Sequence, residues 1–148
     1  MFKSLKIFIK FIVHRLFILL HIRNYIITNL DYQIYQSKKL HTFFGYYDKT
    51  PFSKDGEIIL AIICDKKTGP IKESCNAYIG YFNVSDPNQF ICIGETATWC
   101  WQLGARLMWY GKNNNLIIYN KQLMNGYCSV IQNIDDKKII KELNFPIY

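Results

Sequence analysis

The sequence contains an imperfect internal repeat, and this repeat limits the possible folds more than any other feature. Residues 52–60, FSKDGEIIL, correspond to residues 109–118, WYGKNNNLII. Further along, residues 82–86, FNVSD, correspond to residues 132–136, QNIDD. The first pair is a polar turn followed by an apolar run of strand length, and the second pair is a strand end followed by a turn. From residue 41 onward, the chain is therefore expected to hold two copies of one strand-rich unit.

Repeats of about 40 to 50 residues with four strands each are typical of β-propeller blades. The expected fold class is mainly β, with about two four-stranded propeller-type blades preceded by an N-terminal amphipathic α-helix. The expected divisions are a helix at 1–30, a connector at 31–40 and a partial β-propeller at 41–148, with blade one at about 41–95 and blade two at about 96–148. A single antiparallel sandwich or barrel of about seven or eight strands is the alternative.

Short apolar or aromatic runs, separated by turn residues, mark the expected strands. They cover residues 57–64, 77–84, 90–94, 106–110, 116–120, 127–134 and 139–143. Turns are expected at 54–56, where Gly56 can adopt a positive φ, and at 85–88. Propellers have about four blades or more, so two blades do not close a ring. The chain is therefore expected to be a fragment of a longer protein.

Residues 1–30 have the hydrophobic period of an amphipathic helix. The segment contains neither glycine nor proline, and Lys3, Lys6 and Lys10 fall on one stripe of a helical wheel. Most other positions are apolar, which is typical of a helix lying in a membrane interface. The residues expected to contact the membrane are Lys3, Lys6, Lys10, Phe11, Phe17 and Leu20. A spanning or signal-anchor segment, a cleaved signal peptide and a partner-binding or buried domain helix are the alternatives.

Positive charge is concentrated at the N-terminus. Five basic residues precede Asp31, the first acid, and the rest of the chain is nearly balanced in charge. The domain therefore lacks the clustered basic face of a nucleic-acid-binding protein. The N-terminal excess favours the anionic cytoplasmic leaflet, so the expected location is the cytoplasmic face of the cell membrane, with peripheral or single-anchor attachment, rather than secretion. The expected partners are a membrane lipid surface and a carbohydrate or a protein, with no nucleic acid.

The five cysteines show no CxxC spacing. They are Cys64, Cys75, Cys92, Cys100 and Cys128. This pattern favours free thiols in a reducing compartment over a zinc site, a redox motif or a disulfide framework. The sequence also lacks the common nucleotide-binding, serine hydrolase, zinc protease and calcium-binding motifs. No metal and no cofactor are expected.

Two aromatic stretches carry the side chains best suited to binding. In the first, at 41–49, a histidine and an aspartate, grouped with two tyrosines and Lys49, could act as acid–base groups or ligands beside a central channel. In the second, at 99–109, the faces of three tryptophans could stack on sugar rings while Gln102 and Arg106 bind sugar hydroxyls or a carboxylate. The candidate ligand-binding residues are His41, Tyr47, Asp48, Trp101, Gln102 and Arg106. The structural alternative is that these residues fix turns and fill the space between blades. No catalytic residue is assigned.

The strings HTFFGYYDKTPFSKDGEIILA at 41–61 and ETATWCWQLGARLMWYGKNNNLIIYN at 95–120 resemble the opening blades of a bacterial WD40-like or TolB-like propeller group. The resemblance covers about residues 41–148. At its broadest, it includes oligogalacturonate-lyase-like propellers, whose catalytic and metal-binding residues come from later blades, and it implies a cell-surface polysaccharide context. The expected function is a non-catalytic, membrane-associated binding or scaffold module. The alternative is the N-terminal part of a polysaccharide-acting enzyme, a lyase or glycosyltransferase-associated protein, whose catalytic residues lie beyond this chain.

Overall fold

The computed structural model describes residues 31–37, 40–45, 47–65, 75–112, 114–124 and 126–148, together with Ile12. Backbone contacts divide the chain into two compact units, Met1–Tyr32 and Gln33–Tyr148. All the β-strands of the described residues belong to the second unit. The described ranges include no helical segment that could span a bilayer.

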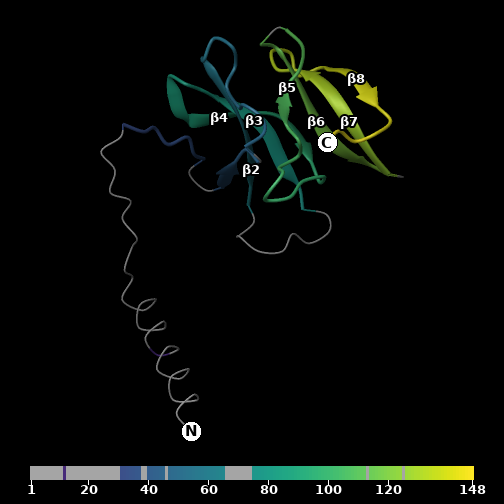
Figure 1. Cartoon of the computed structure of the whole chain (residues 1–148), viewed down its shortest axis with the longest axis horizontal. Coiled ribbons are helices and arrows are strands. Elements are labelled where there is room, and N and C mark those ends of the chain that lie inside the picture. The colour runs from purple at the N-terminus through teal and green to yellow at the C-terminus, as the bar shows by residue number, and fades with distance from the viewer. Residues whose placement is uncertain are drawn as a thin grey trace. The chain divides into compact units, whose positions relative to one another are not determined.

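Two four-stranded antiparallel sheets make up the described part of the second unit, and within each sheet the strands lie side by side in chain order (Figure 1). The first sheet contains β1 (His41–Phe43), β2 (Ile58–Cys64), β3 (Ala77–Asn83) and β4 (Asp86–Thr96). The second contains β5 (Met108–Trp109), β6 (Leu116–Leu123), β7 (Gly126–Asn133) and β8 (Ile139–Leu143). Each sheet is a simple meander, so β1, β4, β5 and β8 are edge strands.

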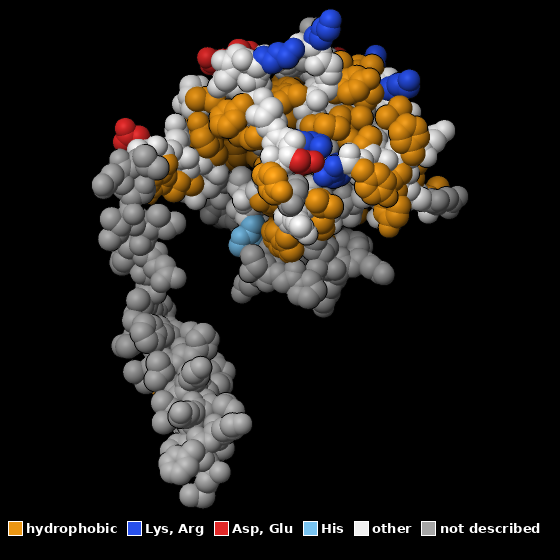
Figure 2. Space-filling model, in the orientation of Figure 1, with side chains coloured by type: hydrophobic (Ala, Val, Ile, Leu, Met, Phe, Trp, Pro, Cys, Tyr) orange, Lys and Arg blue, Asp and Glu red, His pale blue; other side chains and the backbone are white. Residues whose placement is uncertain are grey.

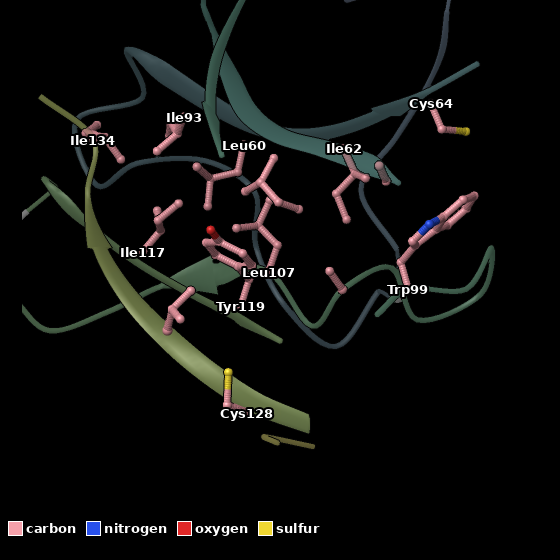
Figure 3. Close-up of a cluster of buried hydrophobic side chains, with 14 of the residues drawn as sticks. Leu60, Ile62, Cys64, Ile93, Trp99, Leu107, Ile117, Tyr119, Cys128 and Ile134 are labelled. Carbon is pink, nitrogen blue, oxygen red and sulfur yellow. The ribbon is translucent and has the colours of Figure 1, made fainter. Parts of the chain in front are cut away.

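The main core lies between the two sheets. Leu60 and Ile62 of β2 point toward Ile117 and Tyr119 of β6, in one cluster of buried side chains (Figure 3). None of these four side chains is more than 1% exposed. Complete burial of an aliphatic side chain of this size stabilises a fold by about 1.5–3 kcal/mol. This apolar layer therefore provides much of the attraction between the sheets.

The apolar sequence of β2 is explained by burial on both of its faces. On the face opposite the main core, Ile59 is paired with Phe82 of β3. The Phe82 ring lies 5.3 Å from the ring of Phe90 and 6.0 Å from that of Tyr35, measured between centroids. The segment 33–37 therefore packs on this second face, and both faces of β2 require apolar residues.

A buried polar network around Gln132 of β7 also joins the sheets. The hydroxyl of Tyr119 donates to Gln132 Oε1 at 2.8 Å, while Gln132 Nε2 donates to the carbonyls of Ile93 at 3.3 Å and Lys137 at 2.8 Å. Gly94 of β4 lies against this network, and a Cβ added there would be 2.6 Å from Tyr119 Oη. The backbone of β4 can therefore approach this closely only because residue 94 has no side chain.

The two repeated polar turns contact each other. Asn114 Nδ2 donates to Asp55 Oδ2 at 2.8 Å, and Asn114 Oδ1 accepts from the amide of Lys54 at 3.2 Å. Lys54 Nζ donates to the carbonyl of Lys112 at 2.7 Å. The internal repeat in the sequence thus produces a turn-to-turn contact between the two sheets.

The C-terminal residues 144–148 are held on β6 and β7. Asn120 Oδ1 accepts from the amide of Ile147 at 2.8 Å, and Asn120 Nδ2 donates to the carbonyl of Ile147 at 2.9 Å. Ser129 Oγ lies 2.9 Å from both Asn120 Oδ1 and the Phe145 carbonyl, so its single proton can serve either. The side-chain amide of Asn120 therefore pairs with Ile147 as a neighbouring strand would.

The predicted fold class is wrong. It places an N-terminal amphipathic α-helix before two propeller-type blades, but no helical element occurs among the described residues. The predicted helix at 1–30 lies outside the described residues except for Ile12, and so has no support. An amphipathic period alone is a weak basis for a helix, because most helical stability in proteins comes from packing of the apolar face. What the described chain forms is a mainly β structure of two four-stranded antiparallel sheets.

Three strands differ from their predicted lengths by more than one residue, and one of them, β6, continues past the predicted end at Asn120 to Leu123. β4 is longer at both ends than the predicted strand 90–94, and it includes Pro87. Proline is tolerated there because β4 is an edge strand, where not every N–H group is needed for pairing. β5 is shorter than the predicted strand 106–110, because Arg106 has a φ of 58°, which is incompatible with a strand.

Candidate functional site

A loop interrupts the edge of the first sheet. β1 ends with Phe43 opposite Ile62 of β2. Pairing with β2 resumes where the amide of Leu60 donates to the carbonyl of Pro51 at 2.9 Å. Residues 44–45 and 47–50 leave the sheet edge between these two points, and they include Tyr47 and Asp48 of the first predicted cluster.

A corresponding loop precedes the edge strand of the second sheet. Cys100 and Gly104 exchange two backbone hydrogen bonds, of 3.1 and 2.9 Å, which close a tight turn. The amide of Asn120 then donates to the carbonyl of Ala105 at 2.8 Å, so the chain rejoins β6 directly. Arg106 follows, in the left-handed region of backbone conformation.

The two loops meet at a pair of glycines. A Cβ on Gly45 would lie 2.8 Å from the carbonyl oxygen of Leu103, and one on Gly104 would lie 2.5 Å from that of Phe44. Both distances are shorter than the 3.0 Å below which real Cβ atoms essentially never occur. Both glycines also have a positive φ, of 129° and 58° respectively. Glycine is therefore required on each side of this contact for two independent reasons.

Asp48 of the first loop lies between two cations. Its Oδ2 is 3.0 Å from Lys49 Nζ and 3.5 Å from Arg106 Nη1. The hydrogen bond from Lys49 is the largest cause that lowers the pKa of Asp48 below its ordinary value of 3.8. Burial opposes this hydrogen bond with a smaller effect, and the charges of Lys49 and Arg106 lower the pKa further. The carboxylate is therefore ionised at neutral pH, and positive charges outnumber it. We refer to the surface formed by His41, Tyr47, Asp48, Lys49, Trp101 and Arg106 as the loop site.

Arg106 is held in an energetically costly arrangement. A left-handed backbone costs a residue with a Cβ about 1–2 kcal/mol. The side chain is only 15% exposed, and Nε is buried without a hydrogen-bond partner among the described residues. A buried donor left unpaired costs about 1–3 kcal/mol. Strained backbone and unpaired polar atoms of this kind occur preferentially where a protein binds something.

Aromatic rings lie on one side of the loop site. Trp101 meets His41 edge-on, with ring centroids 6.4 Å apart, and Phe43 at 5.2 Å. Trp99 packs against Trp101 at 5.0 Å, but Trp99 is only 8% exposed and donates its Nε1 proton to the Cys75 carbonyl at 2.7 Å. Trp99 therefore belongs to the core. Figure 2 shows acidic and basic side chains lying together among hydrophobic ones on the face in view.

The structure brings together residues from both predicted clusters. Asp48 contacts Arg106, and His41 contacts Trp101, across the junction of the two loops. Tyr47, next to Asp48, is 84% exposed. Gln102 does not join them, because it is exposed in the tight turn and has no hydrogen bond to another described residue. The role of these residues in ligand binding stays a prediction.

Lys49 belongs to the first predicted cluster but was left out of the predicted ligand-binding residues, although it makes the shorter contact to Asp48. The close approach of Gly45 and Gly104 was also missed. Each glycine stands inside an aromatic stretch, which was a usable signal, because glycine in such a position often marks a close backbone approach.

No group of three or more His, Cys, Asp or Glu side chains within the described ranges could hold a metal ion. The residues predicted to contact a membrane all lie outside the described residues. These are Lys3, Lys6, Lys10, Phe11, Phe17 and Leu20. Membrane contact therefore stays a prediction from the sequence.

Comparison with protein-family models, with curated proteins and with solved structures gives no match to this chain. The resemblance to WD40-like or TolB-like propellers stays a prediction for the same reason. The geometry of the loop site is the remaining basis for assigning a function.

Proposed function

We propose that this chain is a non-catalytic binding module of the β-propeller type, and that it binds a saccharide at the loop site. Two sequential four-stranded meanders, packed face to face, support the propeller interpretation. The first strands of propeller blades surround a central channel. In such an arrangement, the loops that follow β1 and precede β5 would lie beside that channel, where propellers commonly hold ligands.

The observation that carries this proposal is the state of Arg106. Its guanidinium has five N–H donors, yet only Nη1 has a partner among the described residues, the Asp48 carboxylate at 3.5 Å. Spare donors of a guanidinium suit the hydroxyl and carboxylate oxygens of a sugar. The exposed ring of Tyr47 lies in the same loop as Asp48 and offers an apolar face for the C–H groups of a sugar ring.

Two further observations favour binding over acid–base catalysis at this site. The lowered pKa of Asp48 moves it further from neutral pH, so its carboxylate is a hydrogen-bond acceptor but a poor general acid and a weak general base. His41 makes its ring contact with Trp101, and no hydrogen bond between His41 and Asp48 occurs in the described part of the chain.

The experiment is an NMR titration of the full chain with an oligosaccharide that contains uronic acid. The matched ligand is the same oligosaccharide with its carboxyl groups reduced to alcohols. We expect the acidic ligand to shift the signals of Tyr47 and Arg106 more strongly than the neutral one, because cations outnumber Asp48 in the loop site. Arg106→Gln should weaken binding by about tenfold or more, since a hydrogen bond to a charged group contributes about 1.5–3 kcal/mol.

The control is Lys141→Gln, which removes an exposed positive charge on β8 and should leave binding unchanged. Absence of shifts with both ligands, or equal binding by wild type and Arg106→Gln, would reject the loop site as a saccharide site. Release of new products from the acidic ligand would instead reject the non-catalytic part of the proposal.

Attachment to the cytoplasmic face of the cell membrane is part of the same proposal. Its support is the concentration of basic and apolar residues before Asp31. We expect the full chain to float with vesicles that contain anionic lipid and not with neutral vesicles. A chain truncated before residue 33, at the boundary between the two compact units, should not float. Equal recovery of both proteins with anionic vesicles would contradict membrane attachment.

A further inference from the structure

A second candidate site lies between β4 and the β6–β7 hairpin, and it shares no residue with the loop site. It is an open pocket of about 380 Å³. Pockets that bind small ligands have volumes of about 300–1,000 Å³. The side chains that give it its chemistry are Asn76, Glu95, Lys121, Gln122, Leu123 and Met124.

The two sides of this pocket are fixed relative to each other. Thr96, at the end of β4, also lines the pocket. Its hydroxyl is buried and donates to the carbonyl of Asn120 in β6 at 2.7 Å. The same hydroxyl accepts the amide of Thr98 at 3.0 Å. This hydroxyl therefore holds the two sides of the pocket together, and one side comes from each sheet.

Opposite charges face this pocket without neutralising each other. Glu95 comes from the first sheet and Lys121 from the second. Neither forms an ion pair with the other or with any other described residue. Asn76 Nδ2 donates to Glu95 Oε2 at 3.4 Å, which leaves Oε1 available to a ligand. The polar part of the pocket thus offers one anion and one cation, on different sides.

The hairpin adds an apolar rim to the pocket. Leu123 is 43% exposed and Met124 is completely exposed. Exposed aliphatic side chains beside a polar pocket can pack on the apolar part of a ligand, and methionine adapts its shape readily. The pocket therefore combines a positive group, a negative group and a small apolar surface.

We propose that this pocket binds a zwitterionic small molecule, namely a free amino acid or short peptide with an apolar side chain. The ammonium group of the ligand pairs with Glu95, and its carboxylate pairs with Lys121. Its side chain packs on Leu123 and Met124. A ligand with only one charge would leave the other pocket charge unpaired, and a neutral sugar would leave both unpaired.

The test is an NMR titration of the full chain with leucine, observed at the methyl groups of Leu123 and Met124. N-acetylleucine, which lacks the ammonium charge, and leucine methyl ester, which lacks the carboxylate charge, are the matched ligands. We expect leucine to bind with a dissociation constant of about 1 mM or weaker, because the pocket charges are partly solvated. Each derivative should bind about fivefold more weakly than leucine.

Two pocket variants complete the test. Glu95→Gln should weaken leucine binding about fivefold, and this variant should bind leucine and N-acetylleucine equally well. Lys121→Met should also weaken leucine binding about fivefold, and it should bind leucine and leucine methyl ester equally well. Glu95 is exposed and Lys121 is half-buried, so both variants should fold, and unchanged amide spectra will show that they do. The loop-site variant Arg106→Gln should bind leucine as wild type does. Equal binding of leucine and its two derivatives, no binding of leucine, or binding of the neutral sugar maltose in its place, would each overturn this proposal.

Discussion

Arg106 Nη1 lies 3.5 Å from Asp48 Oδ2, across the junction of two loops that belong to different sheets. The contact depends on the backbone of Arg106, whose φ of 58° is in the left-handed region. At 3.5 Å from a solvent-accessible carboxylate, an ion pair of this kind contributes little to stability. The pair therefore does not repay the cost of the backbone conformation, which points to a use of Arg106 other than stability.

Substitution of Arg106 can separate its backbone strain from its charge. Arg106→Ala and Arg106→Gly both remove the guanidinium, but only glycine adopts a φ of 58° without steric cost. We expect Arg106→Gly to be more stable than Arg106→Ala by about 1 kcal/mol. Urea unfolding of the two variants measures the difference. Equal stabilities would show that the left-handed conformation of residue 106 is not strained.

The contact between the loops predicts a large effect of adding one methyl group. Gly45→Ala and Gly104→Ala each combine a positive φ with a Cβ that would overlap a backbone carbonyl. We expect each to lower the free energy of unfolding by about 2–4 kcal/mol. The control is Gly56→Ala, which also has a positive φ, of 77°, but no atom within 4 Å of the added Cβ. It should lose only about 1 kcal/mol in the same urea measurement.

The pairing of Asn120 with Ile147 predicts that one amide side chain holds the C-terminal residues. Asn120→Ala removes this pairing and also removes one of the two acceptors within reach of the Ser129 hydroxyl, leaving the Phe145 carbonyl as the other. We expect a loss of about 1–3 kcal/mol in the free energy of unfolding. Hydrogen exchange at the Ile147 amide should become faster by more than this global loss explains. The exposed control, Asn88→Ala, should change neither quantity, and a protected Ile147 amide in Asn120→Ala would contradict the pairing.

The internal repeat predicted the strand-rich units because its signals are local. An apolar run such as that of β2, followed by turn residues, has few alternatives to a buried strand. The site depends instead on a contact between distant loops, and nothing local to Asp48 indicates that Arg106 lies beside it. The pocket between Glu95 and Lys121 was missed for the same reason, since its two sides come from different sheets. The amphipathic period of residues 1–30 misled the fold prediction, because the sequence identifies no surface on which the apolar face of such a helix would pack.

The contact between the two polar turns predicts a loss of stability in acid. Hydrogen bonds from Ser53 Oγ at 2.6 Å, the Glu57 amide at 3.1 Å and Asn114 Nδ2 at 2.8 Å lower the pKa of Asp55 below its ordinary value of 3.8, with Ser53 the largest cause. The unfolded chain therefore takes up this proton at a higher pH than the folded chain does. The stabilising contribution of Asp55 is present above pH 3.8 and is lost as the pH falls through the lowered value. Asp55→Asn should flatten this part of the pH dependence of the urea midpoint, and an unchanged slope would contradict the assignment.

The buried contact between Tyr119 and Gln132 predicts a corresponding loss in alkali. Burial raises the pKa of Tyr119 from 10.0 to about 12. Its stabilising contribution is complete below pH 10 and is lost as the pH rises from 10 through 12, because the unfolded chain releases the proton first. A pKa shift of this size corresponds to about 2–3 kcal/mol in the free energy of unfolding.

Tyr119→Phe tests this contribution, with the urea midpoint measured as a function of pH. At neutral pH it should lower the free energy of unfolding by about 1–3 kcal/mol, because Gln132 Oε1 loses its donor in a buried position. Above pH 10 the variant should lose less stability than the wild type, so the difference between them should narrow. Tyr127→Phe is the control, because Tyr127 is 57% exposed, and it should retain the wild-type decline. If the urea midpoint of Tyr119→Phe falls as steeply above pH 10 as that of the wild type, the loss of stability in alkali comes from other groups.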